Sequence, residues 1–183
     1  MNDVLKAIMD RRSIRSFKPE SLKREDLDTI VEAAFMTPSG RNGQPWHMTV
    51  VTDNKLNDSV VEAFKSWHKE NDTFNDDIAK SHNFNHAPCV IYFSADKSNP
   101  RFAVNDIGAM VQTVALAAYS LGIGSLIVWS ALPAFQSLER ETLMKKLGIP
   151  EGYEPQSTIA LGYREGDNPP ARERDKTKVN WIG

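Results

Sequence analysis

Residues 102–125 read FAVNDIGAMVQTVALAAYSLGIGS, a long apolar run whose side chains must be buried by the rest of the chain. From about Phe102 to Leu121 the pattern predicts a helix that is apolar on most of its faces and therefore central in the fold. By length alone, residues 107–128 could span a membrane. Gly122 and Gly124 interrupt that stretch, and aromatic or basic anchors do not flank it on both sides. We therefore predict a core helix and no membrane span.

Segments on both sides of this helix alternate between helical and strand patterns. The predicted helices cover residues 4–9, 27–35, 55–67, 102–121 and 135–147, and the predicted strands cover residues 46–52, 89–93, 126–129 and 157–161. Residues 69–87 are rich in Asn and Asp and poor in apolar side chains, which favours a mobile loop or lid. The tail, residues 164–183, is predicted to be irregular or extended. The pattern indicates one domain over residues 1–183.

Composition and charge narrow the functional classes. Of 183 residues, 40% are hydrophobic and 25% are charged, as in ordinary globular proteins. The 22 basic and 24 acidic side chains give a net charge of −2, without the positive excess typical of nucleic-acid binders and membrane-surface proteins. The single cysteine, Cys89, cannot form an internal disulfide, and Asp3 and Lys6 interrupt any N-terminal signal peptide. We therefore expect a cytoplasmic protein whose anion sites are built locally.

The first local cluster of charge is residues 11–18, RRSIRSFK, which contains four cations and no acid. Arginine suits phosphate because its planar fork donates two parallel hydrogen bonds, and Ser13 could add another donor. A solvated basic turn at a helix C-terminus would have the same composition, because cations there complement the helix dipole. Both interpretations stay open on this segment alone.

A second cluster lies near the other end of the chain. In an extended backbone, alternate side chains point to the same side, which would align four cations of the tail. These cations are Arg172, Arg174, Lys176 and Lys178. Pro169 and Pro170 favour such an extended backbone, so the segment is typical of a strap that grips phosphate. A disordered, charge-balanced tail is the alternative.

The loop at residues 38–45, PSGRNGQP, is rich in side-chain amides, and its Ser39, Asn42 and Gln44 supply donors and acceptors without a titratable acid or base. Asn42 and Gln44 could hydrogen-bond both edges of a planar heterocycle. A turn held by its own Ser and Asn side chains is the alternative interpretation.

Other chemistries find less support in the sequence. His82 and His86 are four residues apart, but Asn83 stands where the zinc-protease pattern needs Glu, so no metal site is predicted. Cys89 lies in an apolar strand without an adjacent cation and is expected to be inert. The Gly122–Ser125 turn follows a helix and lacks the third glycine of a dinucleotide fingerprint. A nucleophile elbow and a P-loop are also absent from the sequence.

Taken together, these segments resemble the FMN-dependent nitroreductase family. Residues 11–15 resemble its N-terminal flavin motif, residues 38–46 its second motif, and residues 162–174 its C-terminal phosphate arm. The core helix with its glycine turn is also similar to the family's long helix. The resemblance implies an α+β fold in which a mixed sheet is flanked by helices. It also implies an intertwined homodimer with FMN between the two chains.

The resemblance further implies which residues bind FMN. The phosphate, ribityl chain and pyrimidine edge would be held by Arg11, Arg12, Ser13, Arg15, Arg172 and Arg174. The partner chain would contribute Pro38, Ser39, Asn42 and Gln44. The stretch that passes the flavin after the glycine turn would be Val128, Trp129 and Ser130.

The activity implied by the resemblance is FMN-dependent oxidation of NADH or NADPH, with ping-pong transfer to nitroaromatic, quinone or similar acceptors. FMN would carry the chemistry, so no catalytic side chain is predicted. Residues 65–87 match nothing in the family, which leaves the acceptor open. The alternatives are a flavin-binding protein without turnover, a family branch with different flavin chemistry, and a colourless anion-binding or nucleic-acid module with salt-dependent binding.

Overall fold

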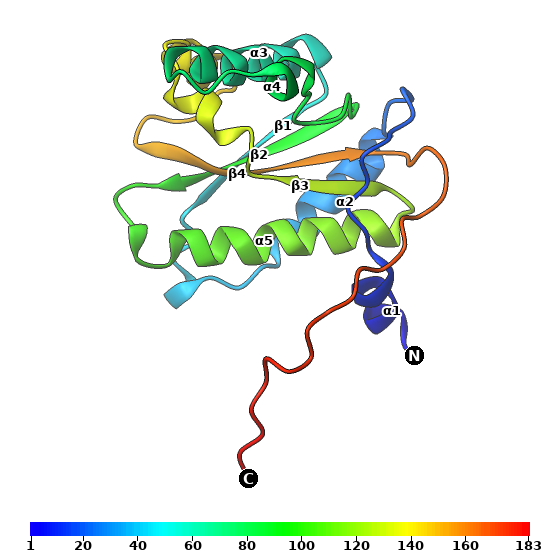
Figure 1. The fold of residues 1–183 in the computed structure, drawn as a ribbon. Helices are drawn as coiled ribbons and strands as arrows, with labels where there is room; N and C mark the ends of the chain where they lie inside the picture. The colour runs from blue at the N-terminus through cyan, green and yellow to red at the C-terminus, as the bar shows by residue number, and fades with distance from the viewer.

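A four-stranded sheet forms the centre of the molecule (Figure 1). The computed structural model describes residues 1–183. In spatial order the strands are β1 (Trp46–Val51), β2 (Cys89–Asp96), β4 (Tyr153–Gly162) and β3 (Gly124–Val128). The two inner strands, β2 and β4, are buried over most of their length because helices cover both faces of the sheet.

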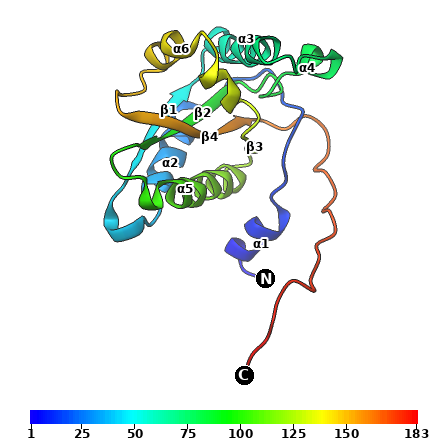
Figure 2. The ribbon, with the colours of Figure 1, turned by 60° about the vertical axis from the view of Figure 1, so that its left-hand side comes forward.

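The helices divide between the two faces of the sheet (Figure 2). One face carries α2 (Arg24–Phe35) and α5 (Pro100–Ser120), and the other carries α3 (Asn54–Glu70) and α6 (Arg140–Lys146). Side chains of β2 alternate between the two cores, as the pleat requires. Ile91 and Phe93 pack with α2 and α5, whereas Val90 and Tyr92 pack with α3 and α6. The two cores therefore share a single sheet.

Helix α5 confirms the prediction of a central core helix. Eight of its side chains are buried, including Met110, Val114 and Ala118. The helix is long and apolar enough to cross a membrane by length and composition. In this fold it packs instead against α2 and the sheet, which accounts for its apolar character.

The α+β class is confirmed, with differences in detail. Neighbouring strands of the sheet all pair antiparallel, and parallel pairing is confined to a bridge between Ser13 and Ser125. The predicted helix at residues 135–147 is divided into a 3-10 turn, Leu132–Gln136, and α6. The break occurs at Ser137, whose hydroxyl accepts a hydrogen bond from the backbone N–H of Glu139 at 3.2 Å.

Residues 69–87 are more structured than the predicted lid. Helix α3 continues to Glu70, and a short helix, α4, covers Asp76–Lys80. The side chain of Asn75 caps α4 by accepting a hydrogen bond from the N–H of Ile78 at 2.9 Å. Phe84 is fully buried in the core on the α3 side. The prediction of a loop in place of a core element is therefore wrong for the turn that contains Phe84, because this aromatic side chain packs in the core.

We expect Tyr92→Phe to lower the free energy of unfolding by about 1–3 kcal/mol. The Tyr92 hydroxyl donates a hydrogen bond of 2.8 Å to Asn57 Oδ1, and both residues are buried. Without the hydroxyl, the amide oxygen keeps its desolvation cost and loses its donor. Urea unfolding measures the change, with Tyr153→Phe at a partly buried position as the control. Equal stability of the Tyr92 variant and the wild type would contradict this account.

Candidate functional site

The segment near the N-terminus that follows the first helix and the segment that follows β4 lie side by side near the C-terminal end of α5 (Figure 1). Residues 16–18 and 163–165 pair as extended segments. The N–H of Lys18 donates to the carbonyl of Tyr163 at 2.8 Å, and the N–H of Glu165 donates to the carbonyl of Ser16 at 3.0 Å. The N-terminal segment is also fastened to β3, where the N–H of Ile14 donates to the carbonyl of Ser125 at 2.9 Å. The cationic segment at residues 11–18 therefore lies beside the start of the segment that leads to the cationic tail.

The glycine turn makes this close pairing possible. A Cβ atom at Gly124 would lie 2.9 Å from Cγ1 of Ile14 and 3.1 Å from the carbonyl oxygen of Gly162. Glycine is thus required where the N-terminal segment crosses β3. Because Gly124 has no side chain, the segment that contains Ile14 can pack directly against the start of β3.

Arg11 is partly buried, with donors that have no partner in the protein. Its Nε and Nη1 atoms are buried and make no hydrogen bond. Burial lowers the pKa of Arg11 below its usual value, and the positive charges of Arg12 and Arg174 lower it further. The positive charge of Arg174 on the tail therefore acts on Arg11 in addition to that of its neighbour Arg12. An anion here would offset both the repulsion and the unmade hydrogen bonds.

Arg12 serves mainly the end of the first helix, α1 (Asp3–Asp10). Its Nη1 donates to the carbonyl of Met9 at 2.6 Å and to the carbonyl of Arg11 at 2.9 Å. This is the helix-terminus role that the alternative interpretation assigned to the cluster. Its Nε is nevertheless buried without a partner. Arg12 thus caps the end of α1, while its Nε and two donors of Arg11 have no hydrogen-bond partner.

The other predicted residues of this group occupy different environments. Ser13 is partly buried in its bridge to β3, whereas Arg15 is exposed. Arg172 and Arg174 are exposed on the tail, which runs away from the body of the molecule (Figure 1).

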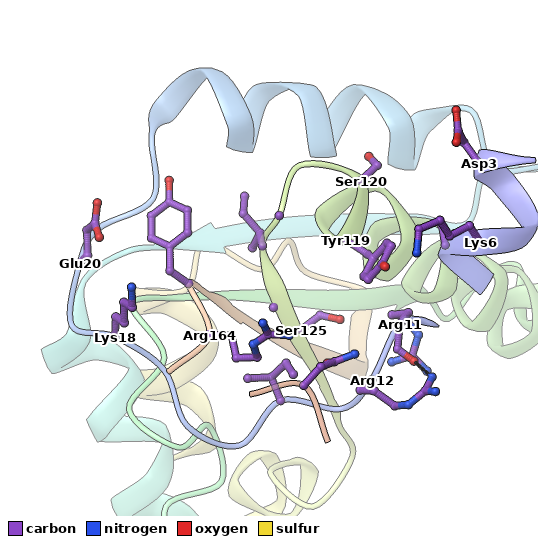
Figure 3. A pocket seen from close by; sticks show the side chains of 17 residues that line it. Asp3, Lys6, Arg11, Arg12, Lys18, Glu20, Tyr119, Ser120, Ser125 and Arg164 are labelled. Atoms are coloured by element: carbon purple, nitrogen blue, oxygen red, sulfur yellow. Dashed lines mark hydrogen bonds between the residues drawn. The ribbon is translucent and has the colours of Figure 1, made fainter. Parts of the chain in front are cut away.

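A cleft of about 810 Å³ opens beside Arg11 and Arg12 (Figure 3). Its walls come from α1, the segment after it, the end of α5, the glycine turn and residues 163–168. Cations outnumber acids among the lining residues, with Lys6, Arg11, Arg12, Lys18 and Arg164 against Asp3 and Glu20. The sequence patterns did not single out Arg164 or Tyr119 as part of a site. Arg164 directly follows the Gly162-Tyr163 pair, and Tyr119 lies three residues before Gly122, so the available signal for both is that they lie close to motifs that the sequence analysis recognised.

The loop at residues 38–44 lies at the opposite end of α5. The N–H of Gly40 donates to both carboxylate oxygens of Asp106, each at 3.2 Å, and a Cβ atom at Gly40 would collide with the Phe102 ring. Tyr119, by contrast, lines the cleft beside Arg11. At 1.5 Å per residue, Asp106 and Tyr119 are about 20 Å apart along the helix. A single chain therefore does not bring this loop to Arg11.

The loop itself is braced by its own side chains, as the alternative interpretation expected. Gln44 donates through its N–H to Ser39 Oγ at 3.1 Å, and through Nε2 to Asn42 Oδ1 at 3.3 Å. Arg41, Asn42 and Gln44 all have left-handed backbone, with φ of 55°, 55° and 42°. Such strain, in a loop whose Pro38, Asn42 and Gln44 are exposed, is typical of segments that clamp a ligand.

The third predicted group follows the far end of β3. Val128 is buried, whereas Trp129 is 65% exposed and Ser130 is also exposed. The Ser130 hydroxyl accepts a hydrogen bond from Nδ2 of Asn83 at 3.3 Å. Strand β3 runs over five residues from the glycine turn to Val128, so a flat ligand could extend along the strand from the turn to this group.

Asp106 is a site residue that the sequence patterns missed. The carboxylate is buried in α5 and its bonds to Gly40 hold the loop at residues 38–44. The sequence does contain a signal for this role: Asp106 is an acidic residue inside an otherwise apolar helix. A carboxylate buried there needs a hydrogen-bond donor from another part of the chain.

Comparison with known proteins identifies the family. The model described as the nitroreductase family matches residues 8–163. The chain belongs to the nitroreductase family. A crystal structure of a nitroreductase with bound FMN from Desulfitobacterium hafniense superposes over 100% of both chains, with a TM-score of 0.91 and 34% identity. The family and the α+β fold predicted from the sequence are thus confirmed.

Relatives of this nitroreductase family member cover most of the chain. A protein of Archaeoglobus fulgidus that carries the name NADH dehydrogenase/NAD(P)H nitroreductase is 35% identical over 168 residues, which is 89% of this chain and 86% of that protein. The FMN reductase [NAD(P)H] of Bacillus subtilis is 26% identical over 186 residues, covering 89% of this chain and 66% of that protein.

Proposed function

We propose that this protein oxidises NADH or NADPH and reduces nitroaromatic, quinone or similar acceptors at an FMN held between two chains. That it is an FMN-dependent oxidoreductase follows from its family and from its likeness to nitroreductases with bound FMN. The acceptor class, the kinetic scheme, the homodimer and the residues that bind FMN are the proposed part.

The observation that carries the proposal is the unpaired guanidinium of Arg11 close to Arg174. Two buried, unpaired donors on one arginine, with the positive charge of Arg174 acting on the same group, fit the phosphate of FMN in charge and in hydrogen-bonding capacity. We place that phosphate between these two arginines. Arg12 would contribute its free Nε, and Ser13, Arg15 and Arg172 would complete this half of the site.

Two copies of the chain complete the site in this proposal. The loop at residues 38–44 lies about 20 Å along α5 from the Arg11 end, so one chain cannot supply both halves. A second copy that runs antiparallel would bring its Pro38, Ser39, Asn42 and Gln44 to the Arg11 end of the first. In the same site, Val128, Trp129 and Ser130 would lie along the flavin ring.

Exposed apolar surface supports the homodimer. On α1, Val4 is 67% exposed and Met9 is 62% exposed. On the tail, which extends away from the body in both views, Trp181 is 91% exposed and Ile182 is 96% exposed (Figure 2). Side chains of this kind are stabilised by burial against another surface, and a second copy offers one.

The side chains of the cleft bind and orient; they do not act as nucleophiles. Hydride transfer between the nicotinamide and the acceptor is the chemistry that FMN supplies when bound. Burial raises the pKa of the Cys89 thiol to about 12, so this lone cysteine stays protonated and unreactive. The cations around Arg11 would also stabilise negative charge in the site.

Two sequence predictions stay predictions: one domain over residues 1–183 and a cytoplasmic location. Both cores pack on the same sheet, which supports one domain. The buried free thiol of Cys89 fits a reducing compartment.

We expect ping-pong kinetics, because one cofactor site must receive the donor and the acceptor in turn. Initial rates at several acceptor concentrations should give parallel double-reciprocal plots. Anaerobic addition of NADH or NADPH should bleach the flavin absorbance before any acceptor is added. Intersecting plots would contradict the alternation. Failure of both donors to bleach the flavin would favour flavin binding without turnover.

A further inference from the structure

Three side chains able to bind a metal ion meet on the α3 face of the sheet, outside the cleft beside Arg11. Asp58 lies on α3, and His82 and His86 lie in the turn that follows α4. One ligand atom from each residue lies within 4.8 Å of the other two. His82 Nε2 is 3.2 Å from Asp58 Oδ1, and the two imidazole rings have centroids 3.8 Å apart. The three residues therefore form one compact cluster.

We propose that Asp58, His82 and His86 bind one divalent transition-metal ion of the zinc class. Neutral imidazole and carboxylate are the nitrogen and oxygen ligands that zinc prefers. With metal–ligand distances of about 2.0–2.1 Å, two ligands of a tetrahedral zinc ion lie about 3.3 Å apart. Asp58 and His82 already have that separation, so an ion fits between them with little movement. The ligand atom of His86 lies within 4.8 Å of the other two, so its exposed side chain must turn to reach the same ion.

The surroundings of His82 suit a metal ligand. His82 is partly buried, and its Nε2 faces the exposed carboxylate of Asp58 at 3.2 Å. The nearby cation, Lys65, is held 3.0 Å from Glu62, which offsets its repulsion of an incoming ion. The exposed side of the cluster, formed by Asp58 and His86, leaves a fourth position to water.

Metal binding changes one hydrogen bond in a defined way. The backbone N–H of His86 now donates to His82 Nδ1 over 3.3 Å. With Nε2 bound to a metal ion, the neutral ring carries its proton on Nδ1, which can no longer accept this bond. The NMR signal of the His86 amide should therefore change when a metal ion binds His82.

A bound ion would tie α3 to the turn at residues 81–87. That turn is fastened to the core by Phe84, and Asn83 within it contacts Ser130 after β3. The local His-x-x-x-His pattern did not predict the site, because its third ligand comes from α3, 24 residues before His82. The contact exists only in the folded chain.

Calorimetric titration of the tag-free, FMN-loaded protein with zinc chloride tests the proposal. We expect one zinc ion per chain, and a loss of affinity of about a hundredfold in Asp58→Asn and in His86→Gln. Both substitutions are at exposed positions and preserve side-chain size. His68→Gln is the matched control, because His68 lies on the same helix outside the cluster and should bind zinc as the wild type does. Wild-type affinity in both ligand variants, or no binding to the wild type, would overturn the proposal.

A second measurement avoids variants altogether. In amide NMR spectra of the wild type, saturating zinc should shift the His86 signal and leave the signal of residue 68 in place. An unshifted His86 amide would also overturn the proposal. The flavin absorbance and NAD(P)H oxidation of the same sample report the cofactor site separately, so failure of one proposal is distinguishable from failure of the other.

Discussion

Arg11→Ala is expected to weaken FMN binding by about 10- to 100-fold, because it removes charge-assisted hydrogen bonds to the phosphate. Two donors of Arg11 are buried and unpaired in the protein, so their loss should leave the fold intact. Titration of the apoprotein with FMN, followed by flavin fluorescence, measures the dissociation constant. Arg24→Ala is the control, because this exposed arginine on α2 pairs only with Asp28.

The same titration with Arg174→Ala tests whether the two arginines share one phosphate. Each single substitution should weaken binding, and the double substitution should cost less than the sum of the two free-energy changes, because the residues act on one group. Strict additivity would place Arg174 elsewhere. FMN affinity equal to that of the wild type in Arg11→Ala would remove the basis of the proposed phosphate site.

The second large effect concerns the two-chain site. We expect Arg11→Ala and the double variant Ser39→Ala/Asn42→Ala each to lose most FMN binding as homodimers. Coexpression of the two variants with different tags, followed by purification of the mixed dimer, should restore binding in half of the sites. In that dimer, one site receives both altered halves and the other receives two native halves.

The control for the mixed dimer is a coexpressed pair in which both chains carry Arg11→Ala. This pair should recover nothing. If Arg11 and the loop at residues 38–44 served the same site from one chain, every site of the mixed dimer would carry one defect. Absence of recovery in the mixed dimer would therefore contradict the antiparallel arrangement inferred from α5.

The sequence predicted those elements whose apolar spacing is regular. Helix α5 and strand β2 were located because their burial follows directly from residue type. The break at Ser137 was not visible, because one side-chain hydrogen bond has no periodic signature. The turn at residues 81–87 was misjudged since its single buried aromatic, Phe84, is surrounded by polar residues.

The candidate site was predictable to a similar extent. The cationic segments at residues 11–18 and 172–178 were visible as charge patterns, and the unpaired donors of Arg11 agree with the phosphate interpretation. Composition could not show that Asp106 would hold Gly40. The approach of Asp58 to His82 also depends on long-range packing, which local patterns do not encode.

The pairing of the two chain ends makes the cofactor site a late product of synthesis. Ser16 and Glu165, which are joined by a hydrogen bond of 3.0 Å, are 149 residues apart in the sequence. The segment after α1 can therefore pair with its C-terminal partner only after 149 further residues have been synthesised, and closing so large a loop slows this step. Until then, the arginine segment has only β3 to bind. The proposed phosphate site is consequently assembled only after residues 163–165 have been synthesised and have paired with the segment after α1.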